Sequence, residues 1–135
     1  MNEDKIDKDK LVKHWVDSSD ANYNSMLVNY KTKEYNWALF IGHLCIEKLL
    51  KALFVKVNDK FPPLIHDLIR LAEKSNLPLN EEQEDLLREI TTFNLEGRYE
   101  DYQQGFYKLC TPEYTTHWIE KIKMTRTWIK ELIAK

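Results

Sequence analysis

The stretch YNWALFIGHLCIEKLLKALFVKV, residues 35–57, decides the fold class of this chain. It holds one glycine and no proline, and its apolar residues recur at helical spacing, so it predicts a helix about 33 Å long at 1.5 Å per residue. A helix with two apolar sides is covered on two sides, because it is either central in a bundle or in contact with another subunit. Leu39, Ile46, Leu50, Leu53 and Val57 form one apolar stripe of this helix, and Trp37, Phe40, Leu44 and Val55 form the other.

Four further helices are predicted on either side of this one. Apolar residues at helical spacing indicate helices over 9–30, 65–74 and 80–93, and Thr111 with Pro112 is typical of the start of a last, C-terminal helix. Asn80 followed three residues later by Gln83 resembles a capping box, and Asp67 suits a helix N-terminus without any functional role. The segment 94–109 is predicted to be irregular.

Together these segments predict an all-α fold, a single up-and-down bundle of four to five helices. Residues 1–135 contain no repeat, no low-complexity tract and no linker long enough to divide them, so one domain is expected. Residues 1–8 are polar and are expected to form a flexible N-terminal extension.

Composition restricts the function classes. The chain has 43% hydrophobic and 31% charged residues, which is typical of a soluble globular protein. Its net charge of −2 argues against a broad nucleic-acid-coating surface, although it allows a local basic cleft. No apolar run reaches the length of a membrane span, the N-terminus does not resemble a signal peptide, and neither Cys45 nor Cys110 belongs to a CxxC pair. These features predict a cytoplasmic, reducing location.

Motifs for metal binding and nucleophilic catalysis are missing from the sequence. The four histidines are far apart and none forms an HExxH or HxxxH pair. His43 and Glu47 lie one helical turn apart, but Glu47 also precedes Lys51 by four residues and is better interpreted as its partner in a surface ion pair. There is no GxSxG elbow, no P-loop and no GxGxxG, so we expect no metal and no cofactor.

The segment NLEGRYED, residues 94–101, carries more charge than a turn needs. Gly97 can adopt a positive φ, which favours a simple turn. Yet four charged residues surround Tyr99. The Arg98 guanidinium suits a phosphate or carboxylate, and Tyr99 and Tyr102 can stack on a base or pack against the protein. Two interpretations stay open here: a turn with salt bridges, and a binding site.

Three motifs in order resemble the HEPN domain, the higher eukaryotes and prokaryotes nucleotide-binding domain. They are WALFIGHLCIEKLLKALFV, then HDLIRLAEKSNL, then GRYED, and the resemblance covers about residues 11–132. The chain is most similar to the bacterial and archaeal branch with an E-K-x-x-K-A helix, an H-D-L helix start and an R-Y-P-D element. The resemblance implies a helical bundle that forms homodimers, and in many members a minimal nucleotidyltransferase as partner, with some pairs acting as toxin–antitoxin modules.

Other HEPN proteins are metal-independent endoribonucleases in which a histidine follows an arginine by about four to six residues. In this chain the six residues after Arg98 contain no histidine, and Glu100 replaces the proline of the R-Y-P-D element. We therefore predict a non-catalytic, nucleotide- or nucleic-acid-binding homodimer that partners a minimal nucleotidyltransferase. An endoribonuclease toxin with an altered catalytic set and a purely structural dimerisation domain are the alternatives.

The resemblance and the charged cluster together predict two sets of functional residues. Residues 47, 48 and 51 are expected to line an open polar cleft, because they lie on the less apolar side of their helix. The predicted ligand-binding residues are Arg98, Tyr99, Asp101, His66, Glu47 and Lys51, and the predicted dimer-interface residues are Trp37, Phe40 and Leu44.

Overall fold

The computed structural model describes residues 6–135 and contains six α-helices in that range. Most of the predicted N-terminal extension, residues 1–5, lies outside the described residues. The helices are α1 (Lys8–Lys31), α2 (Tyr35–Asn58), α3 (Leu68–Lys74), α4 (Glu81–Thr91), α5 (Glu100–Leu109) and α6 (Pro112–Ala134).

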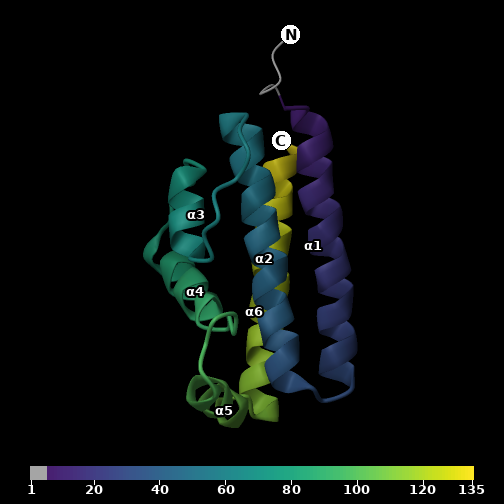
Figure 1. The fold of residues 1–135 in the computed structure, drawn as a ribbon, viewed down its shortest axis with the longest axis vertical. Helices are drawn as coiled ribbons and strands as arrows, with labels where there is room; N and C mark the ends of the chain where they lie inside the picture. Colours follow the sequence, from purple (N-terminus) through teal and green to yellow (C-terminus); the bar gives the residue numbers. More distant parts are fainter. Residues whose placement is uncertain (1–5) are drawn as a thin grey trace.

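The long helices α1, α2 and α6 run side by side, and the short helices α3 and α4 cover the other side of α2 (Figure 1). Helix α5 lies across the end of the bundle, near the start of α6 (Figure 1). Helix α2 contacts each of α1, α3, α4, α5 and α6, so it is the central helix. The all-α prediction is confirmed. None of the helices described is long and apolar enough to cross a membrane.

The prediction of four to five helices is wrong by one helix, because residues 100–109 form α5 rather than an irregular segment. Tyr102, Phe106 and Leu109 recur at helical spacing, a pattern that the prediction missed in a short segment that contains Gly105 and in which only Phe106 is buried. Phe106 packs against Phe93 with 5.6 Å between ring centroids, and Phe93 also contacts the rings of Tyr114 and Trp118. This aromatic cluster fixes α5 against the end of α4 and the start of α6.

The two apolar sides of α2 have different surroundings. Leu39, Ile46 and Leu50 of the first stripe are buried in a core to which all six helices contribute. In the second stripe Val55 is also buried inside the protein, whereas Trp37 is 44% exposed. Val57, predicted for the first stripe, is exposed near the end of the helix.

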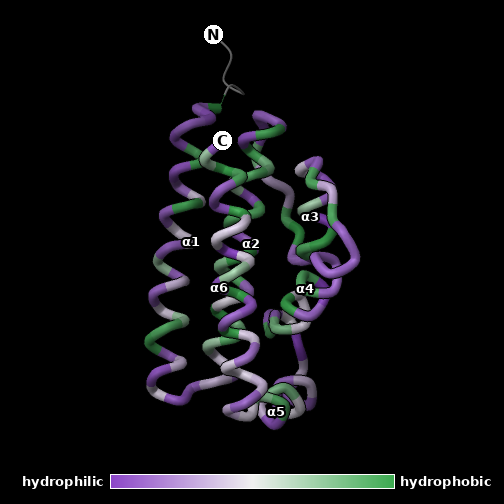
Figure 2. The backbone as a smooth tube through the Cα atoms, turned by 180° about the vertical axis from the view of Figure 1, so that it is seen from behind, coloured by the Kyte–Doolittle hydropathy of each residue, from purple (hydrophilic) through white to green (hydrophobic). Residues whose placement is uncertain are grey.

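Close packing around α2 depends on a glycine. A Cβ at Gly42 would lie 2.6 Å from Ile122 of α6 and 2.9 Å from Met26 of α1, so glycine lets both helices approach α2 at this level. In Figure 2, hydrophobic and hydrophilic positions alternate along the helices, as in amphipathic helices that share one core.

Several helix ends are where the sequence predicts them. The capping box of α4 is formed by Asn80 and Gln83, and Thr111 caps α6 ahead of a proline in its first turn. Helix α3 begins three residues later than predicted, because the Asp67 side chain accepts the backbone N–H groups of residues 69 and 70. Asp7 caps α1 in the same way, with Lys8 as its first residue.

Candidate functional site

An ion pair is buried in the middle of α2. Glu47 is 4% exposed and Lys51 is 7% exposed, and the Lys51 Nζ lies 3.2 Å from the Glu47 Oε2. The predicted pair exists, but the predictions of a surface pair and of an open cleft lined by these residues are wrong. Neighbouring segments cover this side of the helix: His66 reaches Glu47, and the Trp15 ring of α1 lies with its centroid 5.1 Å from the Lys51 Nζ.

His66 links the buried pair to the surface. It precedes the cap of α3, and its Nδ1 lies 2.8 Å from the Glu47 Oε1. Its Nε2 lies 3.6 Å from the Oε2 of Glu96, an exposed carboxylate in the turn after α4. The imidazole thus bridges two carboxylates, one buried and one exposed, and connects α2 with the turn that contains Gly97.

His43, one helical turn before Glu47, holds the backbone of His66. It is completely buried, and its Nε2 lies 3.2 Å from the backbone carbonyl oxygen of His66, to which it donates a hydrogen bond in the neutral ring. Burial lowers the pKa of His43, which keeps the ring neutral. With Nε2 as the donor, Nδ1 is an acceptor, and it has no partner among the described residues. His43 therefore positions the His66 backbone and is shielded from any ligand.

The segment after α4 is a glycine turn fixed to the core. Gly97 has a φ of +71°, the left-handed region that glycine tolerates best. The Asn94 side chain accepts the backbone N–H of Glu96 at 3.1 Å, and Leu95 is buried. The turn interpretation of NLEGRYED is therefore correct for its backbone.

The side chains that follow the turn are exposed. Tyr99 is 88% exposed, and Asp101 lies in the exposed first turn of α5. The Arg98 guanidinium lies 4.4 Å from the centroid of the Tyr102 ring, a cation–π contact, and forms no ion pair within residues 6–135. Arg98 therefore does not fold back onto Glu96, whose carboxylate faces His66 instead.

The six predicted ligand-binding residues form two groups. Glu47 contacts both Lys51 and His66; Glu47 and Lys51 are buried, while the His66 side chain is 48% exposed. Arg98, Tyr99 and Asp101 lie exposed around the start of α5. Glu96 connects the two groups through His66 and was not among the predicted residues. His43 and Trp15 were missed as members of the buried group, because their contacts join positions far apart in the sequence.

The described residues offer little for metal or thiol chemistry. Nowhere in residues 6–135 are three or more His, Cys, Asp or Glu side chains arranged to hold a metal ion. Both cysteines are buried. Burial raises the pKa of Cys45 and raises that of Cys110 to about 12, so both thiols stay protonated and are weak nucleophiles.

A family model with the description HEPN domain matches residues 12–132, nearly the whole chain. The chain belongs to the HEPN domain family. HEPN domains often form dimers and bind nucleic acid, so membership indicates a function related to nucleotides or RNA. A comparison with curated proteins found no match, and a comparison with solved structures found none. In this HEPN domain His66 connects the buried Glu47 with Glu96, in the turn that precedes the exposed Arg98 and Tyr99.

Proposed function

We propose that this HEPN protein is a homodimer that binds a nucleotide or nucleic acid without cleaving it, as the binding subunit of a minimal nucleotidyltransferase in a toxin–antitoxin module. The observation that carries the proposal is the exposed group at the start of α5. Arg98 holds its guanidinium in solvent against a tyrosine ring, and its charge is not neutralised by a carboxylate of the described residues.

Each residue of this group suits a different part of a nucleotide. The Arg98 fork matches phosphate oxygens, and the exposed Tyr99 ring offers a face on which a base can stack. Helix α5 begins without a side-chain cap, so its first backbone N–H groups are available to an anion. The Asp101 carboxylate repels a highly charged phosphate group but can accept hydrogen bonds from ribose hydroxyls. Its presence therefore favours a nucleotide over inorganic phosphate as the ligand.

The surroundings of the histidines support binding without cleavage. RNA cleavage needs a group that moves protons and a group that stabilises the phosphorane. Arg98 suits the second role. For the first role, no histidine lies within six residues after Arg98, His43 is buried, and His66 is held by Glu47 and Glu96.

A binding assay with two probes tests the ligand site. ATP and a fluorescent single-stranded RNA are titrated into the protein and into Arg98→Ala, which is expected to weaken at least one of them by about tenfold or more. Arg88→Ala is the matched control, because Arg88 is an exposed arginine on α4 held by Asp85. Unchanged affinity in folded Arg98→Ala contradicts the site. Failure of both probes to bind the unmutated protein favours the purely structural alternative.

The apolar side of α2 supports the proposed dimer. Trp37 packs edge-to-face on Phe40, with 6.2 Å between ring centroids, and half-buried Leu44 follows one turn later. Trp37→Glu is expected to convert a dimer to a folded monomer on a sizing column. Val28→Glu, at an exposed apolar position of α1, is the control and should leave the dimer intact. A folded Trp37→Glu variant that elutes as a dimer contradicts this interface.

The partnership is tested by coexpression. We expect a minimal nucleotidyltransferase encoded beside this protein to copurify with it and to elute as one complex. Separate elution of the two folded proteins contradicts the proposed partnership while leaving the nucleotide assay interpretable.

One observation favours a second candidate, a metal-independent endoribonuclease. His66 approaches the Gly97 turn from a distant segment, which brings an imidazole beside Glu96, two residues before Arg98. RNA cleavage by the purified protein in the presence of EDTA, lost in both His66→Gln and Arg98→Ala, would replace the binding proposal. Intact RNA after incubation with the folded protein supports binding alone.

A further inference from the structure

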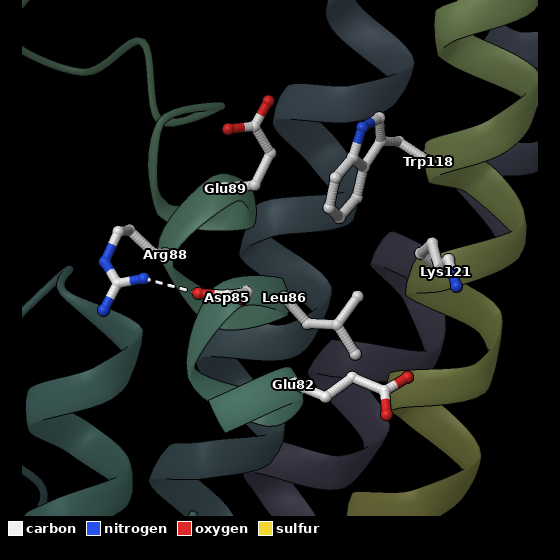
Figure 3. Close-up of a pocket in the computed structure, with 7 residues that line it drawn as sticks. All are labelled: Glu82, Asp85, Leu86, Arg88, Glu89, Trp118 and Lys121. Carbon is white, nitrogen blue, oxygen red and sulfur yellow. Dashed lines mark hydrogen bonds and ion pairs between the residues drawn. The ribbon is translucent and has the colours of Figure 1, made fainter. Parts of the chain in front are cut away.

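A groove follows the side of α4 that faces α5 and α6. Its first part is a hollow of about 400 Å³ between α4 and α6, where the Trp118 ring points from α6 towards Leu86 of α4 (Figure 3). Its second part is a hollow of about 430 Å³ between the end of α4 and α5, lined by Phe106 and Leu109. Glu89 lines both hollows, so the two parts adjoin.

The floor of the groove is apolar and one wall is acidic. Helix α4 carries five carboxylates and one guanidinium, a net charge of −4 in a chain whose net charge is −2. Within the groove Asp85 is paired with Arg88 at 2.8 Å, whereas Glu82 has no ion-pair partner among the described residues. Lys121 of α6 also lines this hollow and is its remaining cation.

The helix dipole accounts for only some of the carboxylates of α4. Glu81, Glu82 and Glu84 lie in the first turn of α4, where carboxylates favour the helix dipole. Glu89 lies near the other end, where the same dipole disfavours a negative charge. The Tyr114 hydroxyl donates a hydrogen bond to the Glu89 Oε2, which holds this carboxylate in the groove. Burial and the neighbouring Glu89 raise the pKa of Tyr114, so the hydroxyl keeps its proton.

The dimensions of the groove match a short peptide. From Glu82 of α4 to its C-terminal cap, Thr92, the groove follows about 15 Å of helix axis, which equals about five residues of extended chain. The apolar hollows fit aliphatic or aromatic side chains, and the carboxylates of Glu82 and Glu89 suit lysine or arginine.

We propose that this groove binds an extended segment of a partner protein that combines apolar side chains with lysine or arginine. The apolar side chains enter the hollows at Trp118 and Phe106, and the cations pair with Glu82 and Glu89. This surface lies on α4, α5 and α6 and adjoins the proposed nucleotide site, because the Tyr102 ring that contacts Arg98 also lines the second hollow. The inference rests on Glu82, Glu89 and the apolar hollows and does not depend on nucleotide binding.

Peptide selection tests the groove with a defined probe. A phage-displayed library of random dodecapeptides is selected on the full-length protein, and enriched peptides are synthesised with a fluorophore for anisotropy titrations. We expect them to combine Leu, Phe or Trp with Lys or Arg. Glu82→Lys should weaken binding by about tenfold or more, and Lys121→Glu should strengthen it by a few-fold, because these changes remove and add negative charge at the rim.

Glu81→Lys is the matched control. It makes the same charge change in the same helical turn, at an exposed position outside the groove, and should alter affinity by less than about twofold. Thermal melts followed by circular dichroism check that each variant is folded.

Four results of the selection and the titrations overturn the proposal, and a fifth concerns the identity of the peptides. They are the absence of enriched peptides, enrichment of acidic or uncharged peptides, an equal effect of Glu81→Lys and Glu82→Lys, and an unchanged affinity in Lys121→Glu. Enriched peptides that reproduce a stretch of this chain also overturn it, because they indicate a contact between copies.

Discussion

Replacing Glu47 by methionine tests the energetic role of the buried ion pair. Methionine has a similar length, so the substitution leaves little cavity but removes the carboxylate that contacts Lys51 and His66. Lys51 is then left 7% exposed with only the Trp15 ring over its ammonium group. Breaking a buried ion pair on one side costs about 3–5 kcal/mol.

Urea denaturation followed by far-UV circular dichroism measures this cost. With a urea dependence of about 2 kcal/mol per molar, the expected loss shifts the unfolding midpoint by about 2 M. Lys51→Met should also be destabilising, because it leaves the Glu47 carboxylate buried beside His66 and the neutral His43 ring, without its lysine partner. The double variant Glu47→Met/Lys51→Met should be more stable than either single variant, because it leaves no unpaired buried charge. Asp17→Met removes an exposed pair with Lys13 at the same spacing and should leave the midpoint nearly unchanged.

Two results would refute this reasoning. A loss below about 1 kcal/mol in Glu47→Met is typical of a surface pair and means that Lys51 reaches solvent by rotating its side chain. Additive effects in the double variant mean that the two charges do not depend on each other in the folded protein.

Three further predictions concern the turn, the buried histidine and a helix cap. Gly97→Ala should lower the free energy of unfolding in urea by about 1–2 kcal/mol, because Gly97 has a φ of +71°. Gly105→Ala, in helical backbone with open space around it, should raise that free energy by about 0.5–1 kcal/mol. Equal effects of the two substitutions contradict the backbone explanation. Burial lowers the pKa of His43 below its ordinary 6.5. Below pH 6.5 the unfolded chain therefore binds a proton at this histidine more readily than the folded protein does, and the free energy of unfolding falls by at most about 1.4 kcal/mol per pH unit. The unfolding free energy of His43→Gln, measured from pH 7.5 to 5, should therefore depend less on pH, and an unchanged slope refutes this. Asn80→Ala should cost about 1 kcal/mol by removing the capping box of α4, with an unchanged melting temperature as the contrary result.

The pairing within the candidate site was predictable from the sequence, but the burial of the pair was not. Glu47 and Lys51 are four residues apart on a helix, and that spacing alone predicts their pairing. Their burial depends on segments that arrive from elsewhere in the chain: His66, which lies 19 residues from Glu47, and Trp15 of α1. For the same reason Glu96 was missed, because its partner is His66 rather than Arg98, two residues further along the chain.

By itself, the sequence determined the helical class, the two apolar sides of α2, the caps at Asn80 and Thr111, and a position at Gly97 that suits a turn, because these depend on periodicity and on contacts within a few residues. Only the tertiary structure decided where α5 lies, since the packing of Phe106 on Phe93 fixes against the end of α4 a segment whose apolar residues 102, 106 and 109 already have helical spacing. It also decided which charges are exposed. Burial is set by the elements that cover a side chain, and those elements are distant in the sequence. For that reason Glu47 and Lys51 lie inside the bundle, while Arg98 and Tyr99 remain in solvent.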